Sequence, residues 1–209
     1  MKERKRASDI LQALPKVTAA LVLVNVILFA VCTFGNGILY NEWSVGVRLI
    51  KDGGWYRIIT AMFLHADIEH LISNMLILYC AGEMVERVVG SVKFAIIYFA
   101  SGIIGNLISC LWEVMSGDYT RSIGASGAVF GIMGALLALV ALKVLRGRTL
   151  QLPRIIAALA ISLYDGFTVT SINNAAHVGG LLGGFIVGGI IGYTLILERR
   201  KQVGKRHEN

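Results

Sequence analysis

Two stretches of this chain each place a polar residue at the start of a long apolar segment: Gly124-Ala125-Ser126-Gly127 and Ala176-His177-Val178-Gly179-Gly180. A polar or ionisable group at membrane depth is costly, and its default interpretation is functional. A serine next to a histidine makes a nucleophile and its general base. The two stretches therefore point to nucleophilic catalysis inside a bilayer, provided that the fold brings Ser126 and His177 together.

The composition indicates a membrane protein. The 209 residues are 56% hydrophobic and 16% charged, with a mean hydropathy of +0.68, whereas ordinary soluble domains carry about a quarter charged residues. The net charge is +7, and the basic residues cluster at the ends and between apolar runs, which fits anionic lipid head groups better than nucleic acid. The 3 cysteines lie in apolar runs without metal-ligand or disulfide spacing. We expect membrane lipid as a partner, and no nucleic acid, metal or cofactor.

Several apolar segments are long enough, or nearly so, to span a bilayer, which takes about 20 residues. There are six: Val17–Phe34, Ile68–Met84, Val92–Trp112, Ser126–Val144, Leu152–Leu163 extended to Asp165, and Ala176–Leu197. They predict an all-α membrane protein with a polytopic bundle of six transmembrane helices. The expected parts are a basic N-terminal segment (1–16), a membrane domain (17–197) and a basic tail (198–209).

The distribution of Lys and Arg predicts the orientation of the bundle. Most of the 20 basic residues lie at the two ends and in the short connections after the second and fourth segments, which favours both termini on the cytoplasmic side. The second, fourth and sixth helices then run in parallel from the outside to the inside. By helical rise, Ser126 lies roughly 25 Å above Lys143 and His177 roughly 31 Å above Glu198. The two residues are thus expected at similar depth.

The longest connection is the first outer loop, 35–64. It contains Tyr40, Trp43, Trp55 and Tyr56, and such amphipathic aromatics prefer the membrane–water interface. A connection of this length has a function or a structure of its own. We expect it to pack against the outer edge of the bundle.

A second polar pair lies at the start of the second predicted helix. His70 and Asn74 are four residues apart, so they share one helix face. Both can donate hydrogen bonds to an oxyanion, as can the backbone N–H of Ser126 at a helix N-terminus. The flanking glycines, Gly124 and Gly127, allow close backbone approach and unusual turn geometry.

Each motif alone has a structural interpretation. Small residues around Ser126 can form a helix-packing face, and Gly180 and Gly184 form a Gly-x-x-x-Gly packing motif. His177 alone is equally well explained as an interfacial residue, and the His70/Asn74 pair as interhelical hydrogen bonding. On the individual residues, these alternatives stay open.

Together, and in this order, the motifs resemble the rhomboid family of intramembrane serine proteases. Arg57…His65…His70-x-x-x-Asn74 resembles the family's segment leading into the second helix, and Gly124–Gly127 its nucleophile motif. Ala176-His177 followed by Gly180 and Gly184 resembles its catalytic-histidine motif. Glu86 resembles a structural glutamate at the inner end of the second helix.

The resemblance implies that Ser126 is the nucleophile and His177 the general base of a dyad with no third carboxylate. It implies oxyanion stabilisation by His70, Asn74 and the Ser126 amide. Phe130 occupies a position where some members have a tyrosine, which would keep the ring against the histidine and lose the hydroxyl. The implied substrates are single-span membrane proteins cut near the outer face.

The implied location is the bacterial plasma (inner) membrane, as a multi-pass integral protein. Two alternatives remain. One is a catalytically inactive rhomboid-like scaffold that binds membrane clients, although such relatives typically lack the serine or the histidine. The other is a small transporter or channel, which the absence of internal repeats disfavours.

Overall fold

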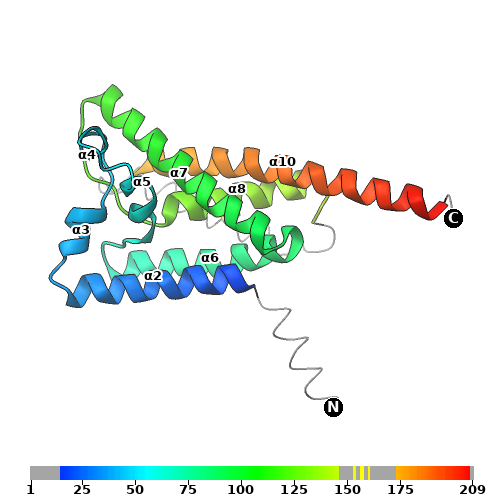
Figure 1. The fold of residues 1–209 in the computed structure, drawn as a ribbon, viewed down its shortest axis with the longest axis horizontal. Helices are drawn as coiled ribbons and strands as arrows, with labels where there is room; N and C mark the ends of the chain where they lie inside the picture. Colours follow the sequence, from blue (N-terminus) through cyan, green and yellow to red (C-terminus); the bar gives the residue numbers. More distant parts are fainter. Residues whose placement is uncertain (1–14, 146–152, 154–155, 158–159, 161–172, 208–209) are drawn as a thin grey trace, which may run out of the picture.

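A computed structural model describes residues 15–145, 153, 156–157, 160 and 173–207 (Figure 1). Within these residues the chain is helical, and the only strand-like pairing is an isolated bridge between Val45 and Ser122. The elements in chain order are α2 (Lys16–Phe34), α3 (Ile38–Trp43), α4 (Val47–Lys51), α5 (Arg57–Thr60), the 3₁₀ helix η1 (Ala61–Phe63), α6 (Ile68–Val89), α7 (Ser91–Ser116), α8 (Ser126–Ala141) and α10 (Asn174–His207). The predicted all-α class is confirmed.

Three of the described helices, α2, α7 and α10, are long and apolar enough to cross a membrane, and α8 is a shorter apolar helix. The fifth predicted segment, Leu152–Leu163 extended to Asp165, lies almost wholly outside the described residues. The count of six spans and the cytoplasmic position of both termini therefore stay predictions.

Helix ends differ from the predicted segments where polar residues continue or stop a helix. The second helix, α6, runs past Met84 to Val89 and stops at Gly90, whose φ of 85° is left-handed. In contrast, α8 ends at Ala141 and not at Val144. There Lys143 adopts a left-handed φ of 56°, and the Val144 amide returns to the Leu139 carbonyl. The last helix continues past Leu197 to His207, so most of the predicted basic tail belongs to it.

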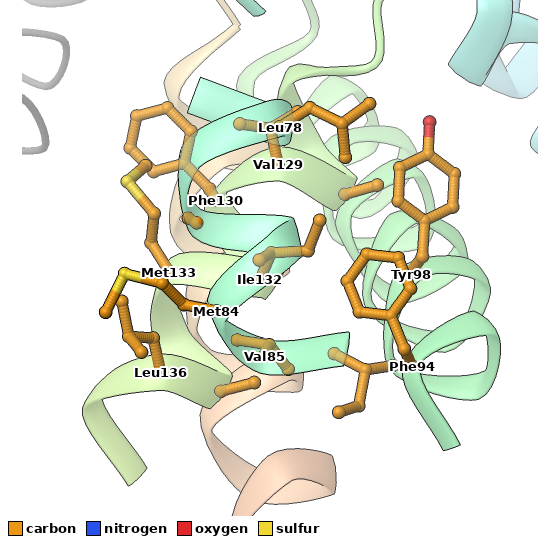
Figure 2. Close-up of a cluster of buried hydrophobic side chains, with 14 of the residues drawn as sticks. Leu78, Met84, Val85, Phe94, Tyr98, Val129, Phe130, Ile132, Met133 and Leu136 are labelled. Carbon is orange, nitrogen blue, oxygen red and sulfur yellow. The ribbon is translucent and has the colours of Figure 1, made fainter. Parts of the chain in front are cut away.

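The shorter helix α8 lies at the centre of the bundle, between α6, α7 and α10 (Figure 1). Most of its residues are buried, because their neighbours cover all sides of it. Figure 2 shows the apolar cluster around it: Leu78, Met84 and Val85 from α6, Phe94 and Tyr98 from α7, and Val129, Phe130, Ile132, Met133 and Leu136 from α8 itself. By contrast, α2 exposes large apolar side chains such as Leu23 and Ile27, as expected for a helix that faces lipid.

Glycines let α8 and α10 touch backbone to backbone. A Cβ on Gly180 would collide with the carbonyl oxygen of Gly127, and a Cβ on Gly184 with that of Gly131. On the other side, a Cβ on Gly134 would collide with the Leu181 carbonyl oxygen. The Gly-x-x-x-Gly of α10 is thus a packing motif, and it brings the starts of α8 and α10 together.

Glu86 joins three helices at the opposite end of the bundle. Its carboxylate accepts hydrogen bonds from the Val17 amide (2.9 Å), from the amide and hydroxyl of Thr18 (2.8 and 2.7 Å) and from the Ser91 hydroxyl (2.6 Å). The first amides of α2 have no partner within their own helix, and the preceding Pro15 offers no capping side chain. A carboxylate from α6 therefore caps α2 and also ties down the start of α7.

The first outer loop is folded and hydrogen-bonded to the bundle, as predicted. Asn106 of α7 donates to the Ile58 carbonyl (2.8 Å), and Glu113 of α7 accepts from the Val47 amide (2.9 Å). Arg57 donates to the carbonyls of Asn41 (2.7 Å) and Ser44 (3.2 Å) within the loop. The loop therefore keeps one arrangement against α7.

We predict that Gly184→Ala destabilises the protein by about 1–3 kcal/mol, the usual cost of overpacking, because the added methyl meets the Gly131 carbonyl. The control is Gly189→Ala in the same helix, where the nearest atom to a Cβ is that of Ala138 at 3.9 Å. The unfolding temperature of that variant should be no lower than that of wild type, since alanine has a higher helix propensity than glycine. Thermal unfolding in detergent measures both, and equal midpoints for the two variants would contradict the packing role.

We predict that Glu86→Gln lowers the free energy of unfolding by about 3 kcal/mol. Glutamine replaces one carboxylate oxygen, which accepts hydrogen bonds, by an –NH₂ group, which donates them. That group would face the donors at the start of α2 or α7, so charge-assisted hydrogen bonds there are lost. Glu83→Gln is the matched control on α6, because Glu83 makes a half-exposed pair with Arg87, worth about 0.3–0.5 kcal/mol. A Glu86 variant no less stable than the Glu83 variant would show that the cap is dispensable.

Candidate active site

Ser126 is the first residue of α8 and is half-buried. The chain enters it through Gly124, whose φ of 131° lies in the region that favours glycine. The Gly124 amide donates to the Ala61 carbonyl (2.9 Å), and Ser122 exchanges two backbone hydrogen bonds with Val45 (2.8 and 2.9 Å). The first outer loop therefore fixes the turn that carries the serine.

His177 lies in the first turn of α10 and is 7% exposed. Its ring stacks on Phe130, with the centroids 4.3 Å apart and the planes at 10°. Phe130 is one turn after Ser126 on α8, so the stack holds the imidazole over the first turn of the helix that begins with the serine. The Ala176 carbonyl oxygen lies 3.4 Å from where a Cβ of Gly127 would be, and this close contact keeps the two helix starts together.

His70 approaches the same place from α6. A methyl group on Gly124 would lie 3.0 Å from His70 Cε1 and 3.4 Å from Ser126 Oγ, so the imidazole and the hydroxyl converge on this glycine. The position of His70 is set by Asp67, which caps α6 by accepting from the His70 amide (2.7 Å). Three helix starts thus meet at one point.

Asn74 lies one turn below His70 and is 5% exposed. Its amide nitrogen donates to the His70 carbonyl (3.0 Å), which leaves a second N–H for another acceptor. Behind them, the His65 ring packs edge-on against His70 at 5.2 Å, and the His65 carbonyl accepts from the Tyr40 hydroxyl (2.6 Å). Burial, and then the neighbouring His70, lower the pKa of His65 to about 3, so His65 stays uncharged at neutral pH.

The predicted residues therefore gather from α6, α8 and α10, although not every expected contact forms. Among the described residues, no hydrogen bond joins Ser126 to His177; their proximity rests on the Phe130 stack and the α8–α10 contact. Catalytic hydrogen bonds are often long in a site without substrate. In the described part of the chain, no group of His, Cys, Asp and Glu is arranged to hold a metal ion.

Asn173 is a supporting residue that the sequence analysis missed. Its Oδ1 accepts from the Ala176 amide (2.9 Å), and its backbone carbonyl accepts from the His177 amide (3.2 Å). Its Nδ2 donates to the hydroxyls of Ser109 on α7 and Ser122 (2.5 and 2.9 Å). An asparagine just before a helix is a readable N-cap signal, as is Asp67 before α6. The two serine partners are far away in sequence and could not be anticipated.

We predict that Asn173→Ala destabilises the protein by about 1–2 kcal/mol and speeds amide hydrogen exchange at the start of α10. Asn173→Asp keeps the oxygen that accepts from Ala176 and loses the donor to the two serines. It should keep the slow exchange at the start of α10 and speed exchange in the Ser122 turn. Hydrogen–deuterium exchange with peptide resolution measures both, and unchanged exchange in the alanine variant would contradict the role.

The sequence is similar to those of known proteins. The Rhomboid domain family matches residues 52–194. The chain is 35% identical to "Rhomboid protease GluP" of Bacillus subtilis (strain 168) over 98% of its own length and 40% of that protein, so it spans about two fifths of this relative. It is 35% identical to "Putative rhomboid protease YdcA" of the same organism, over 83% of this chain and 86% of that one.

A plant relative, "RHOMBOID-like protein 6, mitochondrial" of Arabidopsis thaliana, is 36% identical over 72% of this chain and 47% of that protein. The region matched by the Rhomboid domain family, 52–194, includes the turn with Ser126 and the start of α10 with His177. The family match covers most of the chain, and the relatives at 35–36% identity cover 72–98% of it. The chain belongs to the rhomboid family.

Proposed function

We propose that this protein is an intramembrane serine endopeptidase in which Ser126 is the nucleophile and His177 the general base. The observation that carries the proposal is the Phe130–His177 stack (4.3 Å), since it holds an imidazole over the helix turn that begins with the serine. Two relatives named as rhomboid proteases support the class of activity.

The chemistry follows from the two side chains. His177 takes the hydroxyl proton as Ser126 Oγ attacks the scissile carbonyl, and it then gives that proton to the leaving amine as the C–N bond breaks. A water molecule, deprotonated by the same imidazole, attacks the acyl-enzyme ester. The proton passes to Ser126 Oγ as the ester bond breaks, which releases the carboxylic acid product and restores the free hydroxyl.

The developing oxyanion needs donors that are already in place. His70 is well placed because its ring and Ser126 Oγ converge on Gly124. The Ser126 amide lies at the positive end of α8. Asn74 completes the proposed set with the amide hydrogen that its bond to the His70 carbonyl leaves unused. Gly124 and Gly127 serve this site by their lack of a side chain, and Gly180 by the helix contact.

We propose single-span membrane proteins as substrates, cut near the outer face of the membrane, where their helix can unwind. A peptide bond in an intact helix has its carbonyl engaged in an internal hydrogen bond, so local unwinding must precede attack. The proposed setting is a six-helix bundle with both termini in the cytoplasm, in a bacterial plasma membrane; the two Bacillus relatives support this location.

The alternative is an inactive rhomboid-like scaffold that binds membrane clients. Among the described residues no hydrogen bond joins Ser126 to His177, so the geometry of the two side chains does not by itself separate the scaffold from the protease. The two functions differ in what happens to a bound client: the protease cleaves it by attack of Ser126, and the scaffold only binds it.

We predict that a fluorophosphonate probe labels wild-type protein in membranes, and that Ser126→Ala abolishes the labelling. Ser126→Ala and His177→Ala should each lower cleavage of a co-reconstituted single-span substrate at least about a thousandfold. Ser116→Ala is the control, because Ser116 is exposed, and its hydroxyl donates to the Trp112 carbonyl and accepts from the Asp118 amide at the end of α7. Undiminished cleavage in both site variants would refute the protease, and client binding without cleavage in wild type would favour the scaffold.

A further inference from the structure

One ring nitrogen of His177 has a requirement that the proposed chemistry leaves unmet. Nδ1 is buried and has no hydrogen-bond partner among the described residues. A neutral imidazole carries its one proton on either Nδ1 or Nε2, and the hydrogen bond made by one nitrogen decides which of the two is protonated. If Nε2 is to take the proton of Ser126, the ring proton must stay on Nδ1. The proposed reaction therefore needs an acceptor beside Nδ1.

An oxygen that lacks a donor lies in the same helix turn. Asn174 is the first residue of α10, and its Oδ1 is also buried without a hydrogen-bond partner among the described residues. Asn174 and His177 are three residues apart, so their side chains are neighbours on one helix face, with Cβ atoms about 5–6 Å apart. An unpaired acceptor thus lies within side-chain reach of an unpaired donor.

The other groups around this turn are engaged or apolar. Asn173 uses its Oδ1 and its carbonyl oxygen to accept from backbone amides of the first turn of α10. On the side of α8, the ring of His177 is covered by Phe130, which has no acceptor. Within the described first turn of α10, Asn174 Oδ1 is therefore the side-chain acceptor left for Nδ1.

One hydrogen bond between the two side chains would satisfy both atoms. Leaving a buried donor or acceptor unpaired is costly, and this turn contains one of each. The bond is not formed in this structure, but rotation about the two side-chain torsions of Asn174 makes it without moving the backbone. Catalytic hydrogen bonds often tighten only when a substrate is bound.

We propose that Asn174 is a positioning residue, whose Oδ1 accepts a hydrogen bond from Nδ1–H of His177. This inference rests on the proposed protease function. The bond keeps the ring proton on Nδ1, so Nε2 is ready to take the proton of Ser126 Oγ and later gives it to the leaving amine. While Nε2 holds that proton the ring is positively charged, and the amide oxygen stabilises the charge. Asparagine occurs in this role beside catalytic histidines.

The first test observes the His177 tautomer without any substrate. The full chain is labelled with ¹⁵N-histidine and studied in lipid by solid-state NMR. The His177 signals are identified among those of the 4 histidines by their loss in His177→Gln. At a pH where the ring is neutral, wild type should carry the proton on Nδ1. Asn174→Leu, which has a similar volume and no acceptor, should move the proton to Nε2 or to a mixture. An Nε2–H ring in wild type, or an unchanged Nδ1–H ring in Asn174→Leu, overturns the proposal.

Kinetics test whether this bond matters for cleavage. Asn174→Leu should lower kcat for a single-span substrate between about tenfold and a hundredfold and leave KM nearly unchanged. Asn174→Asp keeps the acceptor oxygen and should restore most of kcat. Its carboxylate also favours the charged imidazole, so the acid side of the kcat/KM–pH profile should move about one unit or more to higher pH. A role in folding alone would not move this profile.

The matched control is Asn173→Asp. It adds the same charge one residue away, with an oxygen held by the Ala176 amide, and should move the profile less. Among the described residues, His70 of α6 is the ionisable group that faces His177. The neighbours from α7 and α8 are uncharged: Gly105, Ser109, Gly127 and Phe130. Equal shifts in the two aspartate variants, or no shift in Asn174→Asp, overturn the proposal.

The two tests also separate this inference from the proposed protease. A tautomer that depends on Asn174 in a protein that cleaves nothing would support the contact and refute the protease. Cleavage that needs Ser126 and His177, with a tautomer indifferent to Asn174, would refute the positioning role alone. If Asn174→Leu does not fold, the pH profile of Asn174→Asp carries the test.

Discussion

The backbone contact between α8 and α10 is the constraint on which the site depends. Helices that carry side chains at their contact pack with their axes 8–10 Å apart, and a nucleophile and base at two helix starts would then be held apart. Here glycines at Gly127, Gly131, Gly180 and Gly184 remove the intervening side chains. Because lipid offers no hydrophobic force between helices, close van der Waals packing of this kind is what holds a membrane bundle together. The contact that stabilises the bundle also sets the geometry of Ser126 and His177.

The two ends of the bundle are held in different ways. At one end, the buried carboxylate of Glu86 joins the starts of α2 and α7 to α6. At the other, the outer loop is joined to α7 and to the turn before α8 by Asn106, Glu113 and the Val45–Ser122 bridge. Bonds made inside a low-dielectric bundle are expensive to break without water to replace them. The buried side chains of Glu86, Asn106 and Glu113 therefore hold elements together at the two ends of the bundle.

Much of the fold could be predicted from the sequence, because apolar length and small-residue motifs are local signals. The starts of α6, α8 and α10 are close to the predicted segment starts, and the gathering of Ser126, His177, His70 and Phe130 agrees with the family resemblance. Helix ends were predicted less well. Hydropathy does not register a left-handed residue such as Lys143, or a helix that continues through polar residues, as α10 does.

Long-range support could not be predicted for a different reason. Nothing in the sequence near Ser122 indicates that Val45 and Asn173 will hold it, because such pairs exist only once the helices are packed. Yet these bonds, with that of Gly124 to Ala61, decide where the turn before Ser126 lies. A nucleophile on a short turn has little rigidity of its own. Its precision comes from the outer loop and from the start of α10, so the part of the chain that looks least ordered in sequence is the part that positions the proposed chemistry.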